Sequence, residues 1–236
     1  MMHRVPPLPD RAALLLDLDG TLLDIAATPD AVVVPVGLRA DLLRLREQLD
    51  DALAIVTGRP VEQVDALLPQ VPYAIAGEHG GAIRRAPHTA LTRAALAPLP
   101  PDWLDAAARL VARHPGALLE RKARGFALHY RLAPDAGAAL EMELRDILGD
   151  QDTHRVLPAH MAFEVKPKGA DKGTAVAALL AERPFAGRVP VYIGDDVTDE
   201  DGMRAAHEVG GYGWRVQEMF GDPAGVRAWL AALARR

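Results

Sequence analysis

Continuous apolar runs alternate with amphipathic stretches along most of the chain. The runs predict strands that are covered on both faces, and they lie at residues 12–16, 52–56, 73–76 and 189–193. Apolar positions at helical spacing predict helices, and these lie at residues 38–49, 60–68, 172–182, from about 198, and 223–233. Such an alternation is typical of an α/β protein. We therefore expect a doubly wound, mostly parallel, Rossmann-like sheet.

The pattern changes at residues 85–101, which are rich in Ala and Pro and indicate a boundary. The following segment predicts the order α-β-β-α-β-β, with helices at 102–113 and 135–148 and strands at 117–121, 126–131, 154–157 and 161–165. This order favours a small four-stranded sheet with helices on one face. The α/β pattern resumes after Pro167. We expect a core made of residues 1–85 and 167–236, with an inserted α+β domain at 86–166.

One face of the small sheet is predicted to be polar, because side chains alternate between the faces of a strand. Leu128 and Phe163 would point to the helices, and their neighbours would point away. The polar face would carry Glu120, Lys122, His129, Arg131, Glu164 and Lys166. An ordinary solvated sheet face is one interpretation. The other is a site for a polyol with an anionic group, because carboxylates accept hydroxyl protons while Lys and Arg bind phosphate.

Composition narrows the classes of function. The chain has 236 residues and a net charge of -5, which disfavours nucleic acid as a partner. It contains no cysteine, which excludes disulfides, thiol catalysis and Cys-ligated zinc. Residues 1–11 have no apolar signal-peptide core, and no apolar run is long enough to cross a membrane. We expect a soluble cytoplasmic protein that does not act at a membrane.

The first apolar strand ends in Asp17-Leu18-Asp19-Gly20-Thr21. Residues two apart in a strand point to the same side, with Cα atoms roughly 6.5 Å apart. Asp17 and Asp19 can therefore reach one reacting group, where one attacks and the other carries a proton. Two such carboxylates are costly to bury without a metal or ligand, which favours a binding or catalytic site. The alternative interpretation is an ordinary solvated turn at the end of the strand.

Other strand ends and helix starts of the predicted core also carry polar side chains. Thr57 follows the second strand, and Glu78 follows the third. Lys172 opens a helix, where the helix dipole favours an anion. Residues 195–201 contain five acids in seven positions. Carboxylate oxygens without cysteine favour Mg²⁺ over zinc as the bound cation.

These motifs, in this order, resemble the four signatures of the haloacid dehalogenase superfamily of phosphohydrolases: DLDGT, TGR, a Lys-Gly helix start and GDDVTDED. More narrowly, the chain is similar to the trehalose-6-phosphate phosphatase family in GEHGG, LERKARGFALHYR and FEVKPKGADKG. The resemblance implies a haloacid dehalogenase core with an inserted cap domain. It implies Mg²⁺-dependent hydrolysis of a phosphosugar in trehalose biosynthesis and functional pairing with a trehalose-6-phosphate synthase.

The resemblance also implies a role for each residue. Asp17 would be the nucleophile that forms an aspartyl-phosphate, and Asp19 would act as general acid and base. Thr57 and Lys172 would hold the phosphate, and Lys172 would also orient Asp17. The implied metal ligands are Asp17, Asp19 through its backbone carbonyl, Asp195 and Asp196, with Asp199 nearby. The implied substrate-binding residues are Gly58, Arg59, Glu78, Glu120, Lys122, His129, Arg131, Glu164 and Lys166.

Several alternatives remain open at this point. A related phosphatase could act on sucrose phosphate, mannosylglycerate phosphate or a hexose phosphate. A phosphomutase also uses an aspartyl-phosphate. A non-catalytic sugar-phosphate sensor would retain the fold, but the intact Asp17, Asp19, Lys172 and Asp195 argue against it.

Overall fold

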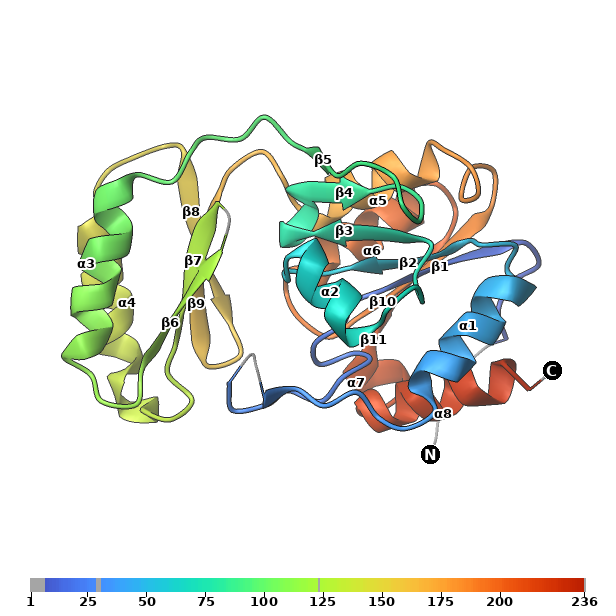
Figure 1. The fold of residues 1–236 in the computed structure, drawn as a ribbon, viewed down its shortest axis with the longest axis horizontal. Coiled ribbons are helices and arrows are strands. Elements are labelled where there is room, and N and C mark those ends of the chain that lie inside the picture. The colour runs from blue at the N-terminus through green and yellow to red at the C-terminus, as the bar shows by residue number, and fades with distance from the viewer. Residues whose placement is uncertain (1–6, 29–30, 123, 236) are drawn as a thin grey trace. The chain divides into compact units, whose positions relative to one another are not determined.

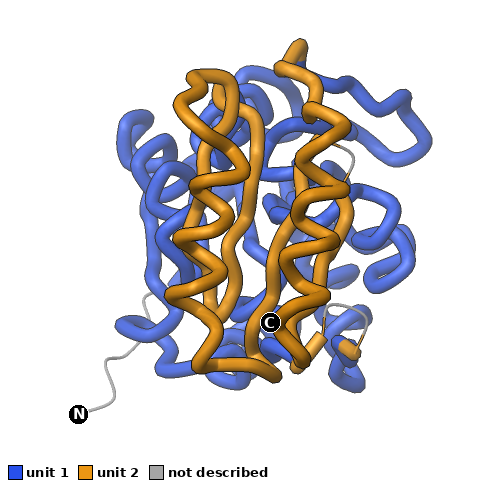
Figure 2. The backbone as a smooth tube through the Cα atoms, turned by 90° about the vertical axis from the view of Figure 1, so that its left-hand side faces the viewer, with its two compact units in different colours: residues 1–26, 32–94, 170–236 blue, residues 27–31, 95–169 orange. Residues whose placement is uncertain are grey.

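The computed structural model describes residues 7–28, 31–122 and 124–235, so the first part of the N-terminal stretch at 1–11 lies outside the described residues. The chain forms two compact units. The first comprises Met1–Ala26, Val32–Ala94 and Ala170–Arg236, and the second comprises Ala27–Ala31 and Ala95–Gly169 (Figure 2). The observed division differs from the predicted boundary at 85/86. Residues 86–94 lie in the first unit because they contain a strand that extends its sheet.

The first unit is built on a seven-stranded sheet. Its strands are β1 (Ala12–Leu16), β2 (Leu53–Val56), β3 (Ala74–Gly77), β4 (Ala82–Arg84), β5 (Thr92–Arg93), β10 (Val189–Gly194) and β11 (Tyr212–Arg215). The order across the sheet is β11-β10-β1-β2-β3-β4-β5. The first five strands in that order are parallel, whereas β4 pairs antiparallel with β3 and β5 pairs antiparallel with β4. The mostly parallel α/β core predicted from the sequence is therefore confirmed.

Helices cover both faces of this sheet. They are α1 (Leu38–Gln48), α2 (Val61–Leu67), α5 (Lys172–Leu180), α6 (Asp199–Glu208), α7 (Val216–Met219) and α8 (Pro223–Leu233). Helices α5 and α6 pack together on one face, and α1 and α8 pack together on the other (Figure 1). Helix α5 begins where Asp171 and Thr174 form a reciprocal capping box. That cap fixes the first turn of α5, where Lys172 lies.

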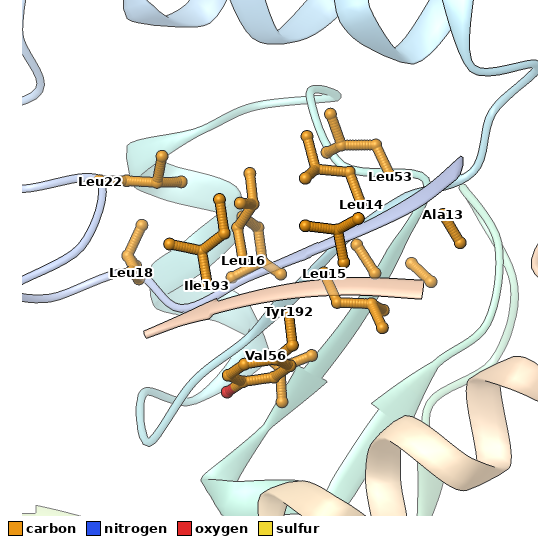
Figure 3. Close-up of a cluster of buried hydrophobic side chains, with 14 of the residues drawn as sticks. Ala13, Leu14, Leu15, Leu16, Leu18, Leu22, Leu53, Val56, Tyr192 and Ile193 are labelled. Atoms are coloured by element: carbon orange, nitrogen blue, oxygen red, sulfur yellow. The ribbon is translucent and has the colours of Figure 1, made fainter. Parts of the chain in front are cut away.

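The centre of the first unit is strand β1, whose five residues are all buried. Leu14, Leu15 and Leu16 pack among side chains of β2 and β10, including Tyr192 and Ile193 (Figure 3). Burying each leucine contributes roughly 1.5–3 kcal/mol. This packing fixes where β1 ends and so where Asp17 lies.

The second unit is an antiparallel sheet backed by two helices. Its elements are α3 (Pro101–Ala112), β6 (Leu118–Lys122), β7 (Gly125–His129), α4 (Gly137–Leu148), β8 (His154–Ala159) and β9 (Ala162–Pro167). The strand order is β6-β7-β9-β8. Helices α3 and α4 cover one face, where Phe126, Leu128, Phe163 and Val165 join their apolar side chains (Figure 1). The predicted α-β-β-α-β-β order and the facing of these residues agree with the structure.

Besides the 3₁₀ helix at Glu78–Gly80, four elements in the described part of the first unit were not predicted. They are β4, β5, β11 and α7, each of four residues or fewer. Strand β11 contains a glycine in Tyr-Gly-Trp-Arg, and such short segments carry too little periodicity to be recognised. Of the helices in the described part of the chain, none combines the length and apolarity needed to cross a bilayer.

Candidate active site

The carboxyl ends of four neighbouring strands bring the predicted core residues to one edge of the sheet. Asp17 follows β1, Thr57 follows β2, Glu78 follows β3, and Asp195 follows β10. The parallel register places Leu16 beside both Ile55 and Ile193, so the chain leaves these strands at nearly the same level. Ligands of open α/β sheets bind at this edge.

Lys172 joins two buried carboxylates at the centre of the site. Its Nζ donates to Oδ1 of Asp17 at 2.7 Å and to Oδ1 of Asp199 at 2.6 Å. Burial raises the pKa of Asp17 well above its usual value, and Asp199 adds to that rise, although Lys172 opposes both. Burial would lower the pKa of Lys172, but the two carboxylates raise it above its ordinary value. The lysine therefore remains a cation that orients Asp17.

Asp199 is held by four hydrogen-bond donors. Its Oδ1 accepts from Lys172 and from the hydroxyl of Tyr192 at 2.6 Å, and its Oδ2 accepts from the backbone N–H groups of Asp195 and Asp196 at 3.1 and 3.0 Å. Burial, followed by the charge of Asp199, raises the pKa of Tyr192, so its hydroxyl keeps its proton and donates it. Asp199 therefore ties the loop after β10 to Lys172.

A metal-binding arrangement is present beside this network. One carboxylate oxygen each from Asp17, Asp195 and Asp199 lies within 4.8 Å of the others. Burial, with the charge of Asp199, raises the pKa of Asp195 to about 6. Thr21 donates to Asp195 at 3.2 Å. An all-oxygen donor set fits a hard divalent cation, and such a cation would offset the repulsion between the carboxylates.

The acidic cluster differs from the predicted ligand set. Asp199 is one of its three members, and the Asp196 carboxylate accepts the backbone N–H of Val197, so the contribution of Asp196 stays a prediction. The chain approaches closely at Gly20, whose φ is +82°, and a Cβ there would overlap the Asp195 carboxylate. Glycine at this position therefore allows Asp195 to lie beside the loop that follows Asp17. The contribution of the Asp19 carbonyl stays a prediction.

Arg59 lies against Asp19. Its Nε and Nη2 donate to the two carboxylate oxygens of Asp19 at 2.6 and 2.8 Å. This contact connects the Thr57-Gly58-Arg59 loop to the Asp17-Leu18-Asp19 turn, which the sequence motifs did not reveal.

The Thr57 loop is packed on the turn that follows β3. Thr57 is buried and accepts the backbone N–H of Arg59 at 3.2 Å. A Cβ on Gly58 would lie 2.5 Å from Nε2 of His79, so the imidazole needs a glycine there. Glu78 pairs with Arg93 at 2.5 Å. Both Glu78 and His79 adopt left-handed backbone, which is uncommon outside glycine.

The second unit collects the predicted polar side chains on the sheet face opposite its helices. Glu120 contacts His129 at 2.8 Å, and Lys122 forms an ion pair with Glu164. Burial would raise the pKa of Glu120, but the hydrogen bond from His129 and the charge of Lys122 lower it below its usual value. Lys166 shares this face, next to Arg155 in the register, and Arg131 lies in the turn after β7.

Comparisons with known proteins identify the family. A sequence model described as trehalose-phosphatase matches residues 15–219. A probable trehalose-phosphate phosphatase of Sinorhizobium fredii is 44% identical over 211 residues, which cover 88% of this chain and 78% of that protein. The trehalose-6-phosphate phosphatase of Escherichia coli is 38% identical over 239 residues, with 98% and 85% covered.

Solved structures agree on the fold. The C-terminal domain of Candida albicans trehalose-6-phosphate phosphatase has a TM-score of 0.78 at 21% identity, covering 97% of this chain and 98% of that one. A haloacid dehalogenase-like hydrolase of Bacteroides thetaiotaomicron has a TM-score of 0.62 at 16% identity, covering 93% and 98%. The fold is therefore the haloacid dehalogenase fold with an inserted cap. With a matching family model and two relatives above 30% identity, the chain belongs to the trehalose-phosphatase family.

Proposed function

We propose that this chain is a Mg²⁺-dependent phosphatase that hydrolyses trehalose 6-phosphate to trehalose and inorganic phosphate. The observation that carries the proposal is the contact of Lys172 with Asp17, which keeps a buried carboxylate oriented at the end of β1. Family membership supports the reaction, and the names of the relatives in Sinorhizobium fredii and Escherichia coli support the substrate.

The reaction divides into two displacements at phosphorus. In the first, an oxygen of Asp17 attacks the phosphoryl group, the bond to the sugar oxygen breaks, and Asp19 gives that oxygen a proton. In the second, Asp19 takes a proton from water, and the resulting hydroxide attacks phosphorus and releases phosphate from Asp17. Thr57 and Lys172 would bind phosphate oxygens throughout.

A bound Mg²⁺ fits the residues at this edge. Asp17 and Asp195 would hold it, and Asp199 would orient them, because its own oxygens already accept four hydrogen bonds. The cation would neutralise negative charge on the phosphoryl oxygens. Phosphate monoester hydrolysis is accelerated up to roughly 10²¹-fold by enzymes. One hydrogen bond to a charged group contributes only about 1.5–3 kcal/mol, so several groups must act together.

We infer that the polar face of the second unit selects the sugar, and that the second unit is the specificity domain of the enzyme. The carboxylates of Glu120 and Glu164 can accept sugar hydroxyls, and Lys122 and Lys166 can donate to them. His129, Arg131, Gly58 and Glu78 are the further candidates for substrate contact, whereas the Arg59 guanidinium, also a candidate from the sequence, already donates to Asp19 and Gln63. A synthase that makes trehalose 6-phosphate is the implied functional partner.

The test is phosphate release from trehalose 6-phosphate, with Mg²⁺ and with EDTA, beside glucose 6-phosphate and sucrose 6-phosphate. We expect Mg²⁺-dependent release with a strong preference for trehalose 6-phosphate, and no release by the Asp17→Asn variant. Equal rates on the hexose phosphate would refute the disaccharide assignment. Isomerised sugar phosphate without free phosphate would instead indicate a phosphomutase.

A further inference from the structure

Arg59 fixes both oxygens of Asp19 with one planar group. The two contacts, at 2.6 Å from Nε and 2.8 Å from Nη2, form a fork. A guanidinium that binds a carboxylate in this way fixes its plane as well as its distance. The Asp19 side chain is 34% exposed, whereas the Arg59 side chain is 10% exposed. Asp19 thus remains reachable while its partner is anchored within the protein.

Arg59 is itself held in place by three neighbours. Its Nη1 donates to Oε1 of Gln63 on α2 at 3.1 Å. Its backbone N–H donates to the hydroxyl of Thr57, and its backbone carbonyl accepts from the N–H of Glu78 at 3.0 Å. A long side chain braced at its tip and along its backbone loses little freedom when it orients another group. No motif in the sequence singled out Gln63.

We propose that Arg59, braced by Gln63, is a positioning residue that orients Asp19 for proton transfer to the leaving oxygen. Each carboxylate oxygen has two acceptor positions, and the fork occupies one on each. The remaining positions stay available, in a fixed plane, for the proton that Asp19 carries. Lys172 orients the attacking carboxylate Asp17, and Arg59 orients the proton carrier Asp19.

This inference rests on the proposed phosphatase reaction, and it predicts a leaving-group signature. Proton donation accelerates the loss of a poor leaving group far more than that of a good one. Phenyl phosphate and p-nitrophenyl phosphate have nearly the same size, and p-nitrophenolate leaves much more readily than phenolate. A variant that misplaces Asp19 should therefore lose turnover on phenyl phosphate selectively, whereas loss of a substrate contact should affect both compounds.

The experiment measures kcat and KM of Arg59→Lys and Gln63→Met on both aryl phosphates. Lysine keeps the charge but cannot form the fork, and methionine keeps the length of Gln63 but removes its acceptor. We expect each variant to lower kcat on phenyl phosphate about tenfold more than on p-nitrophenyl phosphate, which is a fraction of the roughly 10²–10⁴-fold that general acid catalysis contributes. In an Asp19→Asn background the selective loss should disappear.

Arg84→Lys is the matched control. Arg84 donates two hydrogen bonds to the carboxylate of Asp65, at 2.6 and 2.7 Å. Asp65 lies on α2, as Gln63 does. Arg84→Lys should lower stability but should not lower kcat more on phenyl phosphate than on p-nitrophenyl phosphate. It therefore distinguishes the positioning of Asp19 from a general loosening of α2. Equal kcat losses on both aryl phosphates, or a higher KM with unchanged kcat, would overturn the proposal. Aryl phosphate turnover without trehalose 6-phosphate turnover would overturn the substrate assignment alone.

Discussion

The ammonium of Lys172 lies 2.7 Å from the carboxylate of Asp17, although the two residues are 155 positions apart in the chain. Asp17 directly follows the central strand, and Lys172 begins the helix that follows the inserted segment. The contact therefore forms only when the two sequence-distant parts of the first unit fold together. Lys172 thus orients Asp17 and also stabilises the fold, because the same ammonium compensates the buried charge of Asp199.

Removing this cation should damage both properties. Lys172→Met would leave Asp17 and Asp199 buried without their counter-charge, which typically costs roughly 3–5 kcal/mol. We expect a large fall in the free energy of unfolding, measured with urea, and no detectable phosphate release. Lys168→Met is the control, because Lys168 pairs with Asp152 at the surface, and it should change neither property much. A Lys172→Met protein with wild-type stability would contradict the buried-pair account.

Metal binding should depend on pH through Asp195. Burial and the charge of Asp199 raise the pKa of this carboxyl to about 6. A raised pKa means that the folded state favours the protonated carboxyl. The protonated Asp195 carboxyl makes its full contribution to stability below about pH 4, the pKa of Asp in the unfolded chain. This contribution is lost as the pH rises through about 6, the pKa of Asp195 in the folded protein. In EDTA, stability should fall over that range, and Mg²⁺ should restore it above pH 6. Thermal unfolding with and without Mg²⁺ measures both effects.

Asp195→Asn should remove most of that response. The amide cannot ionise, so the decline in EDTA should flatten, and Mg²⁺ should stabilise less at pH 7. For the wild type, a Mg²⁺ concentration tenfold above Kd adds about 1.4 kcal/mol. Asp152→Asn, at an exposed position, is the matched control. A variant that keeps the full Mg²⁺ stabilisation would rule out Asp195 as a ligand.

The polar face of the second unit should affect the sugar and not the phosphoryl group. Glu164→Gln removes the charge that pairs with Lys122 but keeps the shape of the side chain. We expect kcat/KM for trehalose 6-phosphate to fall at least about tenfold, as for a lost charged hydrogen bond, with little change for p-nitrophenyl phosphate. Glu143 lies on helix α4, away from this face, and Glu143→Gln should leave kcat/KM unchanged for both substrates. Equal losses on both substrates would mean that Glu164 only supports folding.

A histidine in the second unit should give its stability a pH dependence. Burial lowers the pKa of His154, which lies edge-on to Trp103 with ring centroids 5.1 Å apart. The folded state therefore takes up a proton less readily than the unfolded state, whose histidine titrates near about 6.5. The free energy of unfolding should fall as the pH drops below that value. Urea unfolding of wild type and His154→Gln between pH 7 and 5 measures the difference.

The exposed His160 supplies the control for that series. His160→Gln should keep the slope of the wild type, whereas His154→Gln should be less stable at pH 7 but flatter with pH. Parallel slopes for the wild type and His154→Gln would show that another group causes the acid destabilisation.

Most of the fold follows from local patterns. The run at 12–16 gives β1 because five successive apolar side chains need burial on both faces, and the spacing of Leu38, Leu42 and Leu45 gives α1. The alternation around Leu128 and His129 assigned both faces of the small sheet correctly, because the side-chain period of a strand is two. The short strand β11 escaped prediction, since its pairing with β10 depends on tertiary contact.

The candidate site divides in the same way. Its residue types and motif order could be read from the chain, and so could the edge of the sheet where Asp17, Thr57 and Asp195 would meet. The family resemblance also predicted that Lys172 orients Asp17 and that Asp199 lies nearby, but it predicted neither the hydrogen bonds to Asp199 nor the contact of Arg59 with Asp19. The structure shows that Lys172 and Tyr192 both donate to Asp199. It also shows that Arg59 donates to Gln63.

By itself, then, the sequence determined the order of the longer strands and helices and the chemistry available at the strand ends. Hydrophobic periodicity and strand-end motifs are local, and they persist in any arrangement of the loops. The tertiary structure decided which charges meet: Lys172 between Asp17 and Asp199, and Arg59 on Asp19. Such pairings depend on distances of a few ångströms between segments far apart in the chain, and only the packed sheet and its helices set those distances.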